Sequence, residues 1–211
     1  MGALIVVDIQ NDFLPGGALA VPHGDEVIAV TNAVMPRFRR VVATQDWHPP
    51  GHGSFAARYP GRVPGERITL GGSAQVLWPV HCVQDSFGAA FAEALNVGRI
   101  DAVVRKGMDP EIDSYSGFFD NDRVRATGLA DKLRELGESE LWVLGLATDY
   151  CVKATALDAV RLGFRVHLIV DGCRAVELEA GDGARAIAEM QAAGVTLVTS
   201  RELLAGASAG R

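Results

Sequence analysis

The sequence of 211 residues is poor in cysteine, in basic side chains and in long apolar runs. Its three cysteines are odd in number and widely spaced, with no Cys-x-x-Cys pair, which argues against a disulfide framework or a thiolate zinc site. The longest apolar runs are far shorter than the ~18 residues that a membrane span requires. The N-terminus also lacks the basic region of a signal peptide. We therefore expect a cytoplasmic protein with no membrane contacts.

Basic residues are outnumbered by acidic ones, 20 against 26, which gives a formal charge of −6. Nucleic-acid-binding proteins need clustered positive charge, so this composition excludes nucleic acid as a partner. The length corresponds to one domain at ~150 residues per domain. We expect a single domain over residues 1–204, followed by a flexible tail at 205–211 that is small and polar. The sequence leaves open whether the chain forms a homo-oligomer.

Short Val/Ile/Leu-rich runs alternate with stretches of helical period along the chain. Near-continuous apolar strands that alternate with helices are typical of a parallel sheet covered on both faces. The sequence therefore predicts an α/β, three-layer, doubly wound fold with a mostly parallel six-stranded sheet flanked by helices. The predicted strands are 3–7, 41–44, 102–105, 140–144, 165–170 and 195–198, and the predicted helices are 25–39, 86–96, 122–136, 149–162 and 181–193.

One segment, residues 46–80, has no convincing period and holds five of the nine prolines and six glycines. A structureless stretch of this length in a compact domain is usually functional, so we interpret it as an irregular loop that belongs to a site.

Reactive side chains follow several predicted strands. In an open α/β sheet, ligands bind outside the carboxyl ends of the strands, where Asp8, Lys106 and Cys151 are all expected. Cys151 falls in the first turn of a predicted helix, where the helix dipole favours a thiolate and lowers the thiol pKa. Asp8 and Lys106 are candidate activating groups. The alternatives are that Cys151 is a buried structural cysteine and that Asp8 and Lys106 form a structural ion pair.

Metal-binding side chains lie at both ends of the irregular loop. Asp46 and His48 form a short chelating pair, and His81 follows the loop. One carboxylate and two imidazoles suit a single divalent ion, with zinc in first place and iron or manganese as alternatives. His52 is an additional ligand, a supporting donor or an ordinary loop residue. The alternative for the whole set is hydrogen-bonded loop histidines.

Five segments together resemble the nicotinamidases, which are cysteine hydrolases of the isochorismatase-like superfamily. The resemblance covers about residues 3–200, in order and without large gaps. The segments are VDIQNDF at 7–13, TQDWHP at 44–49, WPVHCVQ at 78–84, the stretch from KG to DSYSGFF at 106–119, and GLATDYCV at 145–152.

The resemblance implies roles for particular residues. The catalytic triad would be Asp8, Lys106 and Cys151, and the metal ligands would be Asp46, His48 and His81. An oxyanion hole would be formed by the amides of Ala147 and Cys151, after a cis peptide bond between Leu146 and Ala147. Phe13 and Trp78 would be the walls around a pyridine ring.

The activity that the resemblance implies is metal-dependent hydrolysis of nicotinamide to nicotinate and ammonia through a thioester, in NAD salvage, with pyrazinamide as a further substrate. Two alternatives remain. One is a sister cysteine amidase acting on another small amide, such as a ureido or carbamoyl compound. The other is a non-enzymatic sensor that uses the thiol or the metal.

Overall fold

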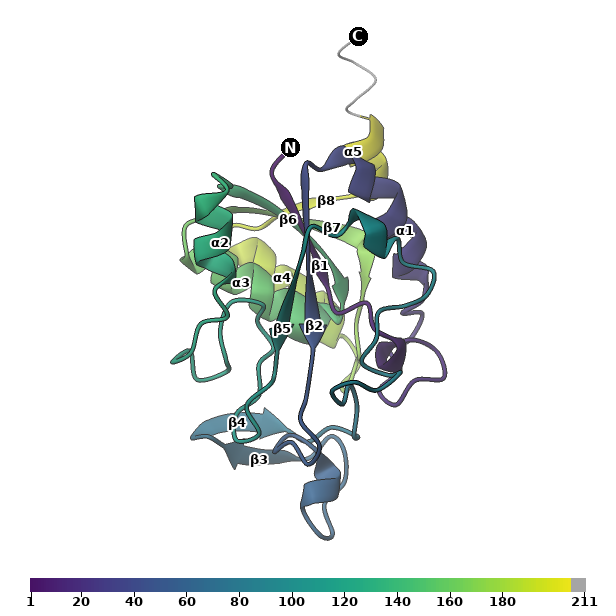
Figure 1. The fold of residues 1–211 in the computed structure, drawn as a ribbon, viewed down its shortest axis with the longest axis vertical. Coiled ribbons are helices and arrows are strands. Elements are labelled where there is room, and N and C mark those ends of the chain that lie inside the picture. Colours follow the sequence, from purple (N-terminus) through teal and green to yellow (C-terminus); the bar gives the residue numbers. More distant parts are fainter. Residues whose placement is uncertain (206–211) are drawn as a thin grey trace.

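A six-stranded parallel sheet forms the centre of the computed structural model, which describes residues 1–205 (Figure 1). The strands lie in the order β5-β2-β1-β6-β7-β8, and every neighbouring pair is parallel. All six predicted strands are present, so the predicted fold class is confirmed. Their bounds are β1 Ala3–Val7, β2 Arg40–Asp46, β5 Ala102–Lys106, β6 Glu140–Leu146, β7 Arg165–Arg174 and β8 Thr196–Val198.

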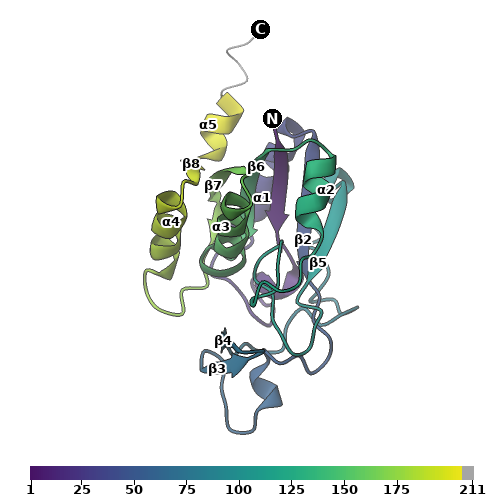
Figure 2. The same cartoon turned by 90° about the vertical axis from the view of Figure 1, so that its left-hand side faces the viewer.

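Helices cover both faces of the sheet, as Figure 2 shows, with α2, α3 and α4 in front and α1 behind. Helices lie on both faces because the chain crosses the sheet in two directions. From β1 it proceeds toward β5, and from β6 it proceeds toward β8, so right-handed crossovers place the connecting helices on opposite faces. None of the described helices is long and apolar enough to cross a membrane. The helices are α1 Glu26–Val34, α2 Leu129–Glu135, α3 Lys153–Arg161, α4 Asp182–Ala192 and α5 Ser200–Ala205.

The core lies between these helices and the central strands. Every residue of β1 is buried, because parallel strands at the centre of the sheet have no face left for solvent. Fully burying one side chain such as Ile5 or Leu144 contributes about 1.5–3 kcal/mol. These central strands hold the loops that follow them in fixed positions.

The predicted helix at 86–96 is wrong. This segment forms turns with a few short-range hydrogen bonds, because several of its backbone polar groups are bonded to the segment after β1. The Asn11 amide donates to Ala90 O at 3.0 Å, and the Ala92 amide donates to Ile9 O at 3.0 Å. The helix expected at 122–136 begins only at Leu129, after a turn in which the Asp120 amide donates to Arg125 O.

The segment 46–80 is less irregular than expected, since it contains an antiparallel hairpin of β3 (Arg67–Leu70) and β4 (Ser73–Val76). Gly71 and Gly72 form its turn with φ of +55° and +83°, the positive values that a tight hairpin turn requires. Figure 1 shows this hairpin beyond the carboxyl ends of β2 and β5. The expected tail lies outside the described residues except for Ala205, and the single domain over 1–204 stays a prediction.

Candidate active site

The carboxyl ends of β1, β2, β5 and β6 bring the predicted side chains together. Asp8 follows β1, Asp46 ends β2 and Lys106 ends β5. Cys151 lies in a π-helical turn, Thr148–Val152, between β6 and α3. The direction of the strand order changes between β1 and β6, and this is the position where doubly wound sheets form binding crevices.

Lys106 is the centre of this group. Its ammonium nitrogen lies 2.8 Å from Asp8 Oδ2 and donates to Asp46 Oδ1 at 2.5 Å, to Ser114 O at 3.0 Å and to Cys151 Sγ at 3.3 Å. Burial alone would lower the pKa of Lys106, but the carboxylates of Asp46 and Asp8 raise it well above its usual value. The side chain is therefore a buried cation.

The two oxygens of Asp8 have different surroundings. Oδ1 accepts a hydrogen bond from the Thr44 hydroxyl at 2.6 Å. Oδ2 faces the Lys106 ammonium at 2.8 Å and has no further polar partner among the described residues. Burial raises the pKa of the Asp8 carboxyl, while Lys106 and Thr44 oppose this rise. Asp8 Oδ2 is thus a buried acceptor with capacity for a proton.

The expectation of a lowered pKa at Cys151 is wrong. Burial raises the pKa of this thiol well above its ordinary value, although Lys106 acts in the opposite direction. The residue lies in a π-helical turn rather than in the first turn of an α-helix. A carboxylate oxygen of Asp8 and one of Asp46 lie within 4.8 Å of its sulfur. The thiol therefore needs a base, and one lies close to it.

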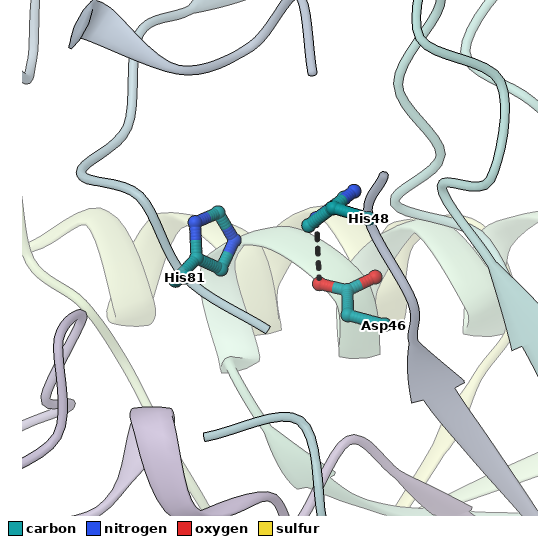
Figure 3. Close-up of side chains that lie close together, drawn as sticks. All are labelled: Asp46, His48 and His81. Atoms are coloured by element: carbon teal, nitrogen blue, oxygen red, sulfur yellow. Dashed lines mark ion pairs between the residues drawn. The ribbon is translucent and has the colours of Figure 1, made fainter. Parts of the chain in front are cut away.

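Asp46, His48 and His81 form the predicted donor set (Figure 3). Their ligand atoms lie within 4.8 Å of one another, and all three residues are buried. His48 Nε2 is 3.6 Å from Asp46 Oδ2, the contact drawn as a dashed line.

The hydrogen bonds of the two histidines suit metal binding. His48 Nδ1 contacts Gly107 O and His81 Nδ1 contacts Pro79 O, each at 2.8 Å. A carbonyl only accepts, so each Nδ1 carries a hydrogen, and the neutral form of each ring has its lone pair on Nε2. Metal-binding histidines usually donate their second nitrogen in this way.

Electrostatics in the donor set are dominated by burial and by neighbouring charges. Burial and the nearby His48 lower the pKa of His81 to about 4, which keeps this ring neutral. Burial alone would raise the pKa of Asp46, but Lys106 and His48 hold it below its usual value. Burial would likewise lower the pKa of His48, and Asp46 raises it. The set fits a divalent cation, because a carboxylate and the Nε2 atoms of two imidazoles, which carry lone pairs when the rings are neutral, lie close together.

His52 stands beside this set but is engaged elsewhere. Its ring centroid lies 4.4 Å from that of His48. Nε2 donates to Ile112 O at 3.3 Å, and Nδ1 lies 2.8 Å from Ser54 Oγ and also accepts from the Ser54 amide. A second possible donor group combines His48 and His52 with Asp113, whose two oxygens already accept hydrogen bonds. The Asp46 set is therefore the better metal site.

One cavity of about 30 Å³ joins the thiol, the donor set and a ring of apolar side chains. Phe13 and Trp78 line it, and so do Tyr150, Leu19 and Val176, which sequence reasoning did not identify. The full lining is Phe13, Leu19, Asp46, His48, Trp78, His81, Asp113, Tyr115, Ala147, Tyr150, Cys151 and Val176.

A larger groove of about 560 Å³ lies on the other side of Tyr150. Its charged side chains include Lys153 and Glu189, which form an ion pair with a 3.0 Å separation. Tyr150 is shared by the groove and the cavity, and its ring packs edge-on against Trp78 with centroids 4.8 Å apart.

Two further features of the site concern the backbone. The Leu146–Ala147 peptide bond is cis, as expected. The contact between Lys106 and Asp46 was not predicted. Both residues end their strands, and they are paired in the register of β2 and β5. The strand ends were known from the sequence, but the adjacency of β2 and β5 was not.

Known proteins resemble this chain over nearly its whole length. A sequence model of the isochorismatase domain matches residues 2–202. A nicotinamidase of Escherichia coli strain K12 is 51% identical over 201 residues, which cover 93% of this chain and 94% of the relative.

Solved structures agree with this result. A nicotinamidase and pyrazinamidase of Acinetobacter baumanii superimposes with a TM-score of 0.92 at 46% identity, covering 95% of this chain and 97% of the other. A pyrazinamidase of Pyrococcus horikoshii in complex with zinc gives a TM-score of 0.74 at 38% identity, with coverage of 93% and 98%.

Proposed function

Because the chain belongs to the isochorismatase family, we propose that it is a nicotinamidase, an amidohydrolase that converts nicotinamide to nicotinate and ammonia. The observation that carries this proposal is the position of one buried ammonium, Lys106 Nζ, 2.8 Å from Asp8 and 3.3 Å from the Cys151 sulfur. A thiol that lines the cavity, with a base and a fixed cation beside it, meets the requirements of acyl transfer through a covalent intermediate.

In the first half of the reaction, Asp8 Oδ2 takes the proton of the Cys151 thiol. The sulfur then attacks the carboxamide carbon, and the electron pair of the carbonyl moves to oxygen. Lys106 keeps its charge beside the sulfur and stabilises the thiolate. The amides of Ala147 and Cys151 hold the oxyanion, a contribution of about 2.7–4 kcal/mol per donor in related enzymes.

In the second half, Asp8 returns the proton to the amide nitrogen, and ammonia leaves as the C–N bond breaks. A thioester remains on Cys151. Asp8 then takes a proton from water while the hydroxide attacks the thioester carbon. Nicotinate leaves and the thiol recovers its proton. A buried carboxyl with a raised pKa suits this repeated transfer better than an ordinary one.

We place one divalent ion, zinc in first place, at Asp46, His48 and His81. When bound, the ion would act as a Lewis acid toward the ring nitrogen of the substrate, which would orient the carboxamide. Phe13 and Trp78 enclose the ring. The pocket should admit pyrazinamide as well, because its flat ring also carries a nitrogen. We place the enzyme in the cytoplasm as one domain over residues 1–204, and its three cysteines are free thiols.

The test is ammonia release from nicotinamide, pyrazinamide, benzamide and a carbamoyl compound, with the purified chain before and after chelation. We expect rapid hydrolysis of the two ring-nitrogen amides, slow hydrolysis of benzamide, and loss of activity on chelation. Cys151→Ala should lower the rate on the order of 10⁴-fold or more. Cys173→Ala is the control, because that thiol is equally buried and does not line the cavity.

Full activity of Cys151→Ala would overturn the mechanism. A preference for the carbamoyl compound would favour the sister amidase instead. Unchanged activity after complete metal removal would contradict the placement of the ion in substrate binding.

A further inference from the structure

A buried glutamine lies directly behind the donor set. Gln10 is fully buried and follows Asp8 by two residues. Its side-chain amide donates from Nε2 to Asp46 O and to Ala89 O, and its Oε1 accepts from the Asp46 amide, each at 2.8 Å. Both polar groups of the Asp46 main chain are thus bonded to one side chain.

The path of the backbone explains why a side chain takes this place. The ladder between β1 and β2 ends at the pair Val6 and Ala43. Asp8 then has φ of +47°, and the chain turns out of the sheet. Asp46 keeps β5 as its neighbour on one side, through its pairing with Lys106. On the side where β1 has already ended, the side-chain amide of Gln10 makes the hydrogen bonds that a neighbouring strand would make.

Asp46 is a position where small displacements matter. Its Oδ1 bonds Lys106 at 2.5 Å, and its Oδ2 lies 3.6 Å from His48 Nε2. Rotation or translation of its main chain would move Oδ2 away from the two imidazoles that complete the donor set.

We propose that Gln10 is a positioning residue for the metal site, and that its amide sets the affinity for the divalent ion by fixing the main chain of Asp46. This inference rests on the proposed function, in which Asp46 is a metal ligand. Groups that orient metal ligands typically change affinity by about 10- to 100-fold when they are replaced. Gln10 does not touch the reacting atoms.

Zinc affinity of the full chain, measured by competition with a chelator of known affinity, tests the proposal. Gln10→Met keeps the length of the side chain and removes all three hydrogen bonds, and we expect about 10- to 100-fold weaker binding. Gln45→Met is the matched control. Gln45 is also buried, adjoins Asp46 in sequence and donates to the same Ala89 carbonyl at 2.9 Å, but it does not bond Asp46. Its affinity should stay within about threefold of the wild type.

Thermal unfolding of the metal-free variants separates affinity from folding. If Gln10→Met fails to fold, Gln10→Asn replaces it, since its shorter amide cannot reach both polar groups of Asp46. Wild-type affinity in the folded Gln10 variant, or an equal loss in Gln45→Met, would overturn the inference. Failure of the proposed metal site looks different: the wild type would not bind zinc, or Asp46→Asn would bind it as tightly as the wild type.

Discussion

The two carboxylate oxygens of Asp8 have different partners, and one hydrogen bond accounts for the difference. Thr44 bonds Oδ1, whereas Oδ2 faces Lys106 and, in the proposed mechanism, exchanges protons with the Cys151 thiol. The hydrogen bond also stabilises the ionised form of Asp8, which partly offsets the effect of burial on its pKa. Removal of the Thr44 hydroxyl should therefore change the pH dependence of the reaction.

We predict that Thr44→Val moves the acid limb of kcat/KM to higher pH. The proposed mechanism needs ionised Asp8, so activity should be lost as the pH falls through the pKa of this carboxyl. Without the hydroxyl that pKa rises further, so the loss begins at higher pH. A hydrogen bond to a charged group contributes about 1.5–3 kcal/mol, which corresponds to about 1–2 pH units.

The measurement is a pH–rate profile of both proteins on nicotinamide. Thr31→Val is the control, since Thr31 is equally buried but donates to Val27 O within α1. Its profile should coincide with that of the wild type. An unshifted limb in Thr44→Val would contradict the role of Asp8 as the base.

Gly107 supports a second prediction about a single residue. Its carbonyl orients His48, its φ is +64°, and a Cβ placed on it would lie 2.4 Å from His48 Cε1. Gly107→Ala should therefore displace the imidazole and weaken zinc binding by about 10-fold or more. Gly128→Ala has similar backbone strain, with φ of +87°, but open space around the new methyl group.

Gly128→Ala should lose about 1–2 kcal/mol of stability, because an L side chain is strained at positive φ. Gly107→Ala should lose more, because its methyl group also clashes with His48. Urea unfolding measures this loss, and chelator competition measures zinc binding. Equal zinc affinities in the two variants would mean that the Gly107 methyl does not disturb His48.

At the scale of elements, two carboxylates link the π-helical turn that contains Cys151 to the loop after β7 and to the start of α4. Asp149, in the π-helical turn, accepts from the amides of Val176 and Glu177 at 3.0 and 2.9 Å. The Glu177 carboxylate in turn accepts from the amides of Gly181, Asp182 and Gly183 where α4 begins. Val176 thereby becomes a fixed wall of the cavity.

We predict that Asp149→Ala raises KM for nicotinamide severalfold and has a smaller effect on kcat, because the Val176 wall loses its anchor. The two amides left without an acceptor should lower the free energy of unfolding by about 1–3 kcal/mol. Asp171→Ala is the control, since Asp171 also accepts two hydrogen bonds, both from Ser200 where α5 begins. It should lose similar stability and keep its KM.

Local sequence patterns predicted the strands but only part of the helices. The strand at 3–7 could be predicted because burial on both faces leaves an uninterrupted apolar run. The segment 86–96 has an equally plausible helical pattern, yet Gln10 and Gln45 bond its Ala89 carbonyl from outside. Such long-range competition for backbone groups leaves no periodic signal in the segment itself.

At the scale of the whole molecule, the parallel sheet accounts for most of what could be predicted about the site. Parallel strands end on one edge, so Asp8, Asp46 and Lys106 had to converge there. The pKa of Cys151 could not be predicted, because it depends on how loops from distant parts of the chain exclude water. The lone pair on His52 Nδ1 likewise accepts a hydrogen bond from Ser54, a contact that exists only in the folded chain.

We predict that zinc raises the melting temperature of the chain. The proposed ligands come from the end of β2 and from the segment after the hairpin, so a bound ion would link these two parts of the chain. At 100 times Kd, binding contributes about 2.7 kcal/mol, or about 5–10 °C for a chain of this size. Differential scanning calorimetry of chelated and zinc-saturated protein measures the shift.

His81→Ala should abolish this response, because it removes one of the two imidazoles. Its metal-free form should still melt cooperatively, which separates loss of binding from loss of the fold. Equal melting temperatures of the chelated and the zinc-saturated wild type would contradict the prediction.

Tyr150 lines both an outer groove of about 560 Å³ and the smaller cavity that contains Cys151. Its ring packs edge-on against Trp78 and Tyr115, so the groove and the cavity share one aromatic wall. We expect the rate of substrate entry to depend on movement of this wall, so that a bulkier amide enters more slowly than a small one.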